Sequence, residues 1–140
     1  MRIVFICEAN STRSQLAEGL AKKLWQRHQP IIESCGSFDG GRINPLVKRI
    51  LIDNNIDCSA QYSKHYIRLE NPQTVDWVIT LCGRDYIGNY FANAHKIHKP
   101  LGIPGIAFGH GNSGIYGAYQ GLAQTVEELL MEIEKVIFKD

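Results

Sequence analysis

The chain's first loop reads Cys7-Glu8-Ala9-Asn10-Ser11-Thr12-Arg13-Ser14. It follows the short apolar run Ile3-Val4-Phe5-Ile6 and comes directly before a helical pattern that begins near Gln15. A strand, a tight loop and a helix in this order form an anion site, because backbone N–H groups of the loop and of the helix N-terminus point at one spot and the helix dipole adds positive potential there. The stretch therefore predicts a strand-loop-helix unit that binds an oxyanion.

Two side chains of this loop carry chemistry. Arg13 can offer two parallel N–H donors to a tetrahedral oxyanion, and Cys7 lies in the same positive field, where a thiol ionises more readily and becomes a nucleophile. Asn10 tolerates the left-handed backbone that such loops need, and Ser14 could donate a hydrogen bond to the Cys7 thiolate. Cys7 and Arg13 are therefore candidate catalytic residues. The candidate oxyanion-binding residues are Glu8, Ala9, Asn10, Ser11, Thr12, Arg13 and Ser14.

Residues 7–14 resemble the signature loop of the low-molecular-weight protein tyrosine phosphatases. The longer stretch from Asn10 to Gly19 is still more similar to that of their relatives, the thiol-linked arsenate reductases. Three further stretches fit this subgroup: Glu33-Ser34-Cys35-Gly36; Asn54-Asn55-Ile56-Asp57-Cys58-Ser59 followed by Ser63-Lys64; and Asp76-Trp77-Val78-Ile79-Thr80-Leu81-Cys82-Gly83. The resemblance covers about residues 1–85 and implies the phosphatase fold, with strand order 2-1-3-4.

The hydrophobic pattern alternates strand and helix along the chain. This alternation favours an α/β fold, a four-stranded parallel sheet with helices on both faces in a three-layer, Rossmann-like arrangement. We expect strands at 2–6, 31–35, 75–81 and 94–98, helices at 14–29, 45–54 and 121–138, and a turn of helix near 66–67. Residues 99–120 hold six glycines and two prolines, so we expect them to form a loop. We expect residues 1–140 to form a single domain of the family fold.

The length, charge and cysteine spacing of the chain limit the class of protein to which it can belong. A chain of 140 residues is the size of one ordinary domain, and its formal charge of +1 gives no reason to expect nucleic acid or an anionic membrane as a partner. No apolar stretch is long enough to span a bilayer, and the chain runs from Met1 straight into a strand, so we expect no signal peptide. The four cysteines have neither zinc-knuckle nor CxxC spacing. We therefore expect a cytoplasmic protein with reduced thiols and without a bound metal or cofactor.

Three of the four cysteines follow expected strands. Cys7, Cys35 and Cys82 lie at the carboxyl ends of the first, second and third strands. Right-handed crossovers place these ends on one edge of the sheet, where ligands bind in open parallel sheets. We therefore expect the three thiols to lie near one site.

Resemblance to the arsenate reductases implies a redox reaction. Cys7 would attack arsenate, and a second thiol would then attack the Cys7 sulfur, releasing arsenite and leaving a disulfide. Cys82 fits the second role by its Thr-Leu-Cys-Gly context, and Cys35 is another candidate for it. Members that recycle through thioredoxin carry a third cysteine seven residues further on, where this chain has Asn89. The external reductant is therefore open between thioredoxin, and glutathione with glutaredoxin.

Resemblance to the phosphatases implies hydrolysis of phosphotyrosine, which needs a general acid. In the family this acid is an Asp in an Asp-Pro pair beyond the fourth strand, but Gly105 and Ile106 stand there and residues 86–126 contain no Asp or Glu. The absence of acid catalysis typically costs ~100- to 10,000-fold with a poor leaving group. Three residues could replace the acid: His110, which is the first candidate, His98 and Asp85. A phosphatase with an unusual acid is therefore the second reading.

Two loop positions depart from the family pattern. Ala9 stands where most members have Gly, so a positive φ there would cost about 1 kcal/mol or more. Glu8 places a negative charge beside the nucleophile, and if it pointed inward it would weaken anion binding. Together with the missing acid, these departures keep a third reading open, a phosphate-binding protein without turnover.

Overall fold

The computed structural model describes residues 1–38, 41–83, 87–103 and 111–139. Its sheet contains β1 (Arg2–Cys7), β2 (Ile31–Gly36), β3 (Trp77–Thr80) and β4 (His95–His98). The strands are all parallel and their order is β2-β1-β3-β4. The expected four-stranded α/β sheet and the implied strand order are confirmed.

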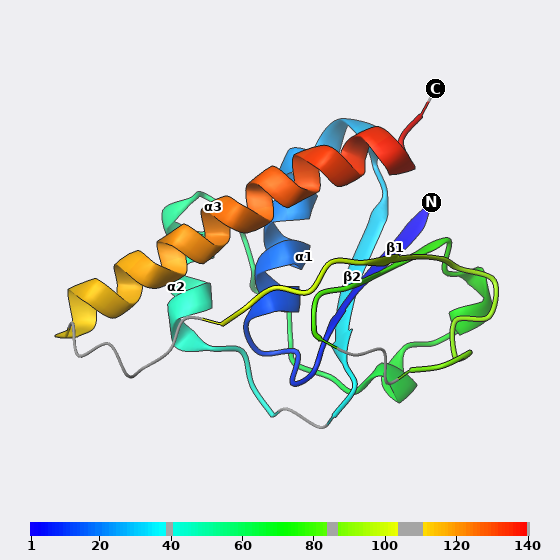
Figure 1. Cartoon of the computed structure of the whole chain (residues 1–140), viewed down its shortest axis with the longest axis horizontal. Coiled ribbons are helices and arrows are strands. Elements are labelled where there is room, and N and C mark those ends of the chain that lie inside the picture. Colours follow the sequence, from blue (N-terminus) through cyan, green and yellow to red (C-terminus); the bar gives the residue numbers. More distant parts are fainter. Residues whose placement is uncertain (39–40, 84–86, 104–110, 140) are drawn as a thin grey trace.

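Three α-helices pack against one another on one side of the sheet (Figure 1). They are α1 (Arg13–Leu24), α2 (Pro45–Asp53) and α3 (Gly111–Ile137). α1 contacts β1 and β2 as well as the other two helices. Within the described ranges, no helix has both the length and the apolar character that crossing a membrane requires.

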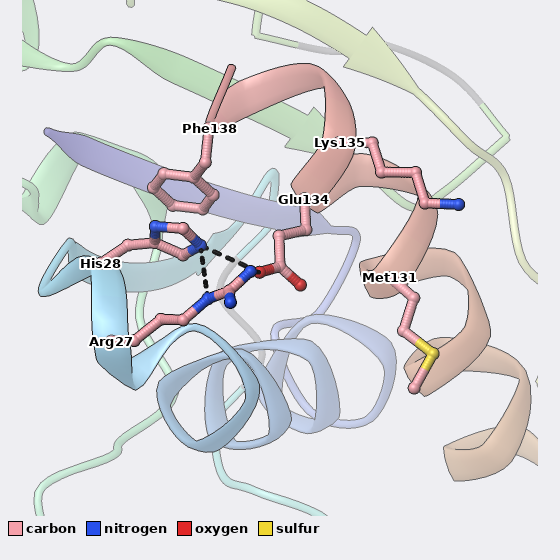
Figure 2. Close-up of a pocket in the computed structure, with 6 residues that line it drawn as sticks. All are labelled: Arg27, His28, Met131, Glu134, Lys135 and Phe138. Carbon is pink, nitrogen blue, oxygen red and sulfur yellow. Dashed lines mark hydrogen bonds and ion pairs between the residues drawn. The ribbon is translucent and has the colours of Figure 1, made fainter. Parts of the chain in front are cut away.

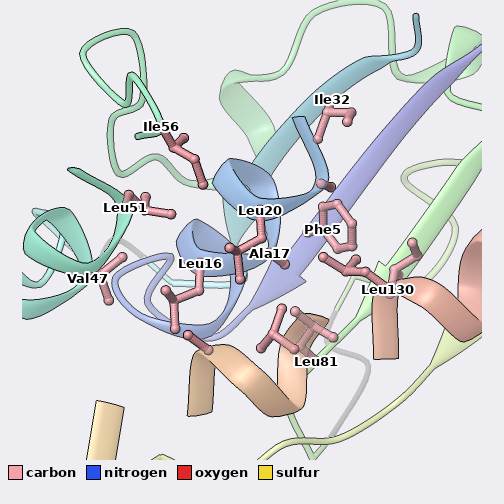
Figure 3. Close-up of a cluster of buried hydrophobic side chains, with 14 of the residues drawn as sticks. Phe5, Leu16, Ala17, Leu20, Ile32, Val47, Leu51, Ile56, Leu81 and Leu130 are labelled. Atoms are coloured by element: carbon pink, nitrogen blue, oxygen red, sulfur yellow. The ribbon is translucent and has the colours of Figure 1, made fainter. Parts of the chain in front are cut away.

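The core on this face forms around α1. Leu16, Ala17 and Leu20 share one stripe of the helix and are all buried. Figure 3 shows them between Phe5 of β1 and the side chain of Leu51 from α2. Each fully buried leucine contributes about 1.5–3 kcal/mol relative to an exposed one. This packing fixes α1 relative to β1, and it therefore fixes the ends of the loop that joins them.

The other face of the sheet is covered by shorter elements. Val4 and Ile6 of β1 point to this face because side chains alternate along a strand. The covering residues include Leu69 and Val75, which end the single-turn 3₁₀ helices η2 (Tyr66–Arg68) and η3 (Pro72–Thr74). Among the described residues, the helices that cover this face are therefore single 3₁₀ turns, in contrast to the three α-helices on the other face.

The largest difference from the sequence expectation concerns α3. The helix begins at Gly111 rather than near Gly121, so the expected loop over 99–120 is wrong from Gly111 onward. Smaller differences occur at α1, which ends at Leu24 and continues as the 3₁₀ helix η1 (Gln26–His28), and at β3, which is shorter than expected.

Contacts with α2 explain the early start of α3. The ring of Tyr116 lies 4.0 Å from the Arg49 guanidinium, and its hydroxyl donates a hydrogen bond to Asp53. One turn further on, Tyr119 is buried in the core. These contacts outweigh the low helix propensity of glycine, which costs about 1 kcal/mol per residue.

Gly117→Ala is expected to raise the free energy of unfolding by about 0.5–1 kcal/mol, because alanine has the higher helix propensity. A Cβ at Gly117 meets nothing within 4 Å, so the substitution adds no clash. Urea unfolding measures the change. Gly102→Ala is the matched control, since Gly102 is equally open but lies outside any helix. Equal effects of the two substitutions would contradict a helix at residue 117.

The last turns of α3 pack onto the residues that follow α1 (Figure 2). The His28 ring stacks on Phe138 with centroids 4.0 Å apart, and Glu134 pairs with His28 and Arg27, each at 2.9 Å. The hydrogen bond with His28, supported by Arg27, lowers the pKa of Glu134. A groove of about 720 Å³ lies here. It is at the opposite end of α1 from residues 7–14, so it is not part of the predicted anion site.

Candidate active site

Residues 8–12 form the loop that joins β1 to α1. The backbone N–H groups of this loop and its backbone carbonyls point in different directions. Its N–H groups donate to no acceptor in the part of the chain that the structure describes. Its carbonyls face neighbouring segments: those of Glu8 and Ser11 accept from the N–H groups of Phe38 and Asn44 at 2.9 and 3.0 Å, and that of Ala9 accepts from Ser63 Oγ at 3.1 Å. Unpaired N–H groups of one short loop form an anion site. We call residues 8–12 together with the Arg13 side chain the oxyanion cradle.

The cradle turns at Asn10, which has a left-handed φ of 54° as expected. Ala9 is not among the described residues with positive φ. The replacement of glycine at that position therefore causes no backbone strain. Glu8 is half-buried.

The side chain of Asn10 sets the direction of the hydrogen bond to Cys7. Its Oδ1 accepts from the backbone N–H of Lys64 at 3.0 Å, which identifies the other atom, Nδ2, as the donor. Nδ2 donates to Ser14 Oγ at 2.7 Å, and Ser14 Oγ lies 2.8 Å from Cys7 Sγ. Because Ser14 Oγ accepts from Asn10, its own proton is available for Cys7. The geometry therefore supports the predicted hydrogen bond from the Ser14 hydroxyl to the Cys7 sulfur.

The guanidinium of Arg13 is buried and has two different edges. Nη1 donates to the carbonyl of Leu101 at 2.9 Å and lies 3.5 Å from that of Leu81. Nε has no hydrogen-bond partner among the described residues. A buried, unpaired guanidinium N–H is costly, and pairing with an oxyanion would remove that cost. The contacts of Nη1 hold the group so that the Nε edge can serve the anion.

Cys82 follows the carboxyl end of β3, beside the cradle. The preceding residue, Leu81, donates its N–H to Ile6 at 2.7 Å, and its carbonyl faces Arg13. The segment that carries Cys82 is thus held against the end of β1 and against the cradle arginine. Cys82 is buried, and none of the four cysteines forms a disulfide.

Cys35 faces away from the cradle. It pairs with Ile6 in the β1–β2 register and packs with Val4 and Ile6 on the face opposite α1, whereas Cys7 contacts Ser14 on the α1 side. Burial raises the pKa of the Cys35 thiol. A protonated thiol is a poor nucleophile. The geometry therefore disfavours Cys35 as a resolving thiol, although its backbone lies near the site.

Of the three candidates for a general acid, the structure describes His98 alone. His110 and Asp85 lie outside the described residues, as do Gly105 and Ile106. His98 is described and is exposed at the end of β4. Asn89, where the thioredoxin-linked relatives have a third cysteine, is exposed too. No cluster of three or more His, Cys, Asp or Glu side chains in the described ranges could hold a metal ion.

Sequence reasoning missed two features of the site. Gly36 lets the cradle approach β2: a Cβ on it would lie only 2.6 Å from the carbonyl oxygen of Glu8. Glu18 is buried on α1 and accepts a hydrogen bond from Ser34 Oγ at 2.6 Å. Gly36 and Ser34 both belong to one of the stretches that resemble the arsenate reductases. Glu18 offered one signal, its place in the Asn10–Gly19 stretch that resembles the arsenate reductases.

The backbone cradle, the Cys7–Ser14 contact and the free edge of Arg13 together define a cysteine-based oxyanion site at the carboxyl edge of a parallel sheet. The chain belongs to the low molecular weight phosphotyrosine protein phosphatase family, whose model matches residues 2–137.

Among its relatives, the chain is similar to several arsenate reductases. It is 34% identical over 113 residues to one from Halalkalibacterium halodurans, covering 76% of each chain. It is 38% identical over 82 residues to a glutaredoxin arsenate reductase from Synechocystis, covering 59% of this chain and 60% of the relative. The match thus spans less than two thirds of the Synechocystis protein. A solved structure of an arsenate reductase in the phosphate binding state superposes with a TM-score of 0.77 at 26% identity, over 97% of this chain and 98% of that one.

Proposed function

We propose that this protein is a thiol-linked arsenate reductase with Cys7 as the nucleophile and Cys82 as the resolving thiol. The observation that carries the proposal is the arrangement of the two edges of the Arg13 guanidinium. Its free Nε edge is available for an oxyanion, and its Nη1 edge faces the carbonyl of Leu81, the residue directly before Cys82. One side chain thus links the anion site to the segment of the second thiol. The arsenate reductases among the relatives support the same function.

In the proposed reaction, arsenate binds to the N–H groups of the cradle and to Arg13. The Cys7 thiolate attacks arsenic, an S–As bond forms as one As–O bond breaks, and the departing hydroxide takes up a proton from solvent and leaves as water. Cys82 then attacks the Cys7 sulfur as a thiolate. The S–S bond forms while the electron pair of the S–As bond passes to arsenic, so As(V) becomes As(III) and leaves as arsenite. The two thiols are oxidised to one disulfide.

An external thiol must return two electrons to this disulfide. Asn89 cannot relay the disulfide to the surface as a third cysteine would, so the reductant has to reach the Cys7–Cys82 bond itself. We propose glutathione with glutaredoxin, since a relative carries glutaredoxin in its name, and thioredoxin is the alternative. The cytoplasm keeps such thiols reduced, and the proposed reaction belongs there.

Hydrolysis of a phosphate monoester is the second candidate function. The unpaired N–H groups of residues 8–12 can bind any tetrahedral oxyanion, and the family to which the chain belongs is named for its phosphatases. This reaction would need only Cys7 and Arg13, together with an acid or an activated leaving group. Phosphotyrosine, whose leaving group is poor, would react slowly without the acid.

Thiol counting with disulfide mapping tests the proposal. Fully reduced protein mixed with arsenate is expected to go from four free thiols to two, with a disulfide mapped to Cys7 and Cys82. Phosphate is the control and should leave all four thiols. An unchanged count with arsenate would refute the reductase. Hydrolysis of an activated aryl phosphate would then identify a phosphatase, and binding of phosphate without turnover would identify a binding protein.

A further inference from the structure

The hydrogen-bond chain that reaches Cys7 continues inward beyond Asn10. The same Nδ2 that donates to Ser14 also donates to Ser34 Oγ of β2, at 2.9 Å. Ser34 Oγ in turn donates to Glu18 Oε1 at 2.6 Å. The other carboxylate oxygen, Oε2, accepts from Lys22 Nζ at 2.7 Å. Glu18 is only 4% exposed, so the chain runs through the interior from the nucleophile to a buried carboxylate.

Every hydrogen bond in this chain has a fixed direction. A carboxylate that is paired with a lysine can only accept, so Ser34 must donate its proton to Glu18. The Oγ atom of Ser34 is then left to accept from Asn10. The second proton of Asn10 Nδ2 goes to Ser14 Oγ, and the Ser14 proton goes to Cys7. An anion at each end thus orients two hydroxyls about one central amide.

We propose that Glu18 is a positioning residue: through Ser34 and Asn10 it holds the Ser14 hydroxyl as a donor to Cys7 Sγ. A donor aimed at a thiolate stabilises the reactive form of the nucleophile. This role rests on the proposed function of Cys7 as the nucleophile. Glu18 itself does not touch Cys7 or the cradle.

The charged groups around this hydrogen-bond chain do not replace Glu18 in orienting the Ser34 hydroxyl. They are Lys22 from α1, Glu33 from β2 and Lys64 from the segment before η2; the Cys35 thiol, whose pKa burial raises, lies beside them on β2. Burial lowers the pKa of Lys64, and the negative charge of Glu18 opposes that shift. The Lys64 ammonium contacts the carbonyl and the ring of Tyr62. It therefore supplies positive charge without offering Ser34 an acceptor.

Replacing Glu18 is expected to shift the pH at which the Cys7 thiolate forms. The direction of this shift distinguishes an orienting role of Glu18 from a purely electrostatic one. If Glu18 acted on Cys7 only through its negative charge, removing the carboxylate would make the thiolate easier to form. If Glu18 acts by orienting the hydroxyls, its removal lets the Ser34 proton turn to another acceptor and weakens the donor at Cys7. The first effect moves thiolate formation to lower pH and the second moves it to higher pH.

The experiment is the pH profile of Cys7 alkylation by iodoacetamide, followed on the Cys7 peptide by mass spectrometry. Glu18→Met removes the acceptor at similar volume, and its profile is expected to move to higher pH by about one unit, the loss of one hydrogen bond to a charged group. Glu18→Gln keeps an acceptor oxygen and should restore a profile close to wild type. Lys23→Met is the surface control, because Lys23 lies on the same helix but its ammonium contacts the carbonyl of Asn54 and not Glu18.

A move to lower pH in both Glu18→Met and Glu18→Gln would overturn the proposal, and so would unchanged profiles. Ser34→Ala provides a second route if Glu18→Met fails to fold, since it removes the same bond from the other end and should move the profile in the same direction. The double variant should show no further shift, because both changes break one chain; additive shifts would overturn the proposal. The assay contains no arsenate, so its result is separate from the outcome of thiol counting.

Discussion

Cys82→Ser is expected to lower arsenate turnover by on the order of a thousandfold or more, because removing a nucleophile that acts in a covalent step abolishes that step. A serine hydroxyl cannot attack the Cys7 sulfur to form a disulfide. The S–As adduct on Cys7 would then have no intramolecular exit. We expect the cradle to keep its geometry, since Arg13 and Ile6 contact this segment through the backbone of Leu81.

Turnover is measured as arsenite formation in the presence of glutathione and glutaredoxin, and in a separate series with thioredoxin. Cys58→Ser is the matched control: Cys58 is partly buried against the helix-side core, and the proposed reaction does not use it. Its turnover should stay within about twofold of wild type, because substitutions away from functional features have small effects. Alkylation of Cys7 should be the same in both variants.

Cys35→Ala distinguishes the two candidates for the resolving thiol. Cys35 is buried on the opposite face of the sheet, and its raised pKa opposes attack, so the variant should still form the arsenate-dependent disulfide. If Cys82→Ser kept full turnover while Cys35→Ala lost it, the assignment of Cys82 would be wrong. The two cysteines would then have exchanged roles despite the side-chain direction of Cys35.

The parts of the fold that the sequence predicted well are those specified by local pattern. The apolar run before Cys7 and the periodic leucines after Arg13 define a strand and a helix without reference to the rest of the chain. The order of the strands came from the family resemblance. The left-handed turn at Asn10 could be expected as well, since Asn is one of the few residues that adopt it readily.

The parts that the sequence did not predict depend on contacts between distant segments. The first turns of α3 are rich in glycine, and the packing of Tyr116 and Tyr119 against α2 and the core stabilises their helical state. The orientation of Cys35 follows from its register with Ile6, which needs the strand pairing to be known. Strand position alone placed its backbone correctly but could not say which face its thiol occupies.

The buried polar residues of the site show the same limit. Glu18 and Ser34 are 16 residues apart and belong to a helix and a strand, so their hydrogen bond cannot be read from local spacing. Once it is present, the bond gives Asn10 and Ser14 a single arrangement. The arrangement of the two hydroxyls thus depends on each member of this buried chain having a partner, because an unsatisfied member would allow other hydroxyl orientations.

Gly36→Ala is expected to lower the rate of arsenate-dependent thiol loss by about 100-fold, because misplacement of a reacting group by ~1 Å costs about that much. The added Cβ would lie 2.6 Å from the carbonyl oxygen of Glu8 and 3.1 Å from the backbone nitrogen of Asn10. Both atoms belong to the cradle, and neither is the end of a flexible side chain. The clash can be relieved only if the cradle moves away from β2, and the unpaired N–H groups of residues 8–12, which we propose to bind the anion, then move with it. We also expect a loss of about 1–3 kcal/mol in the free energy of unfolding, as for other overpacked sites.

Gly19→Ala is the matched control, since a Cβ there meets an equally close neighbour of a different kind. The contact is 2.6 Å to Cδ2 of Leu51, a side-chain end that can rotate, and it lies on the α2 side of α1 rather than in the cradle. This variant is expected to change the unfolding midpoint while leaving thiol loss and phosphate binding close to wild type. Isothermal titration with phosphate and urea unfolding of both variants separate the two effects. If Gly19→Ala weakened phosphate binding as strongly as Gly36→Ala, general loosening of the core would account for both, and the close approach of β2 to the cradle would have no specific part in anion binding.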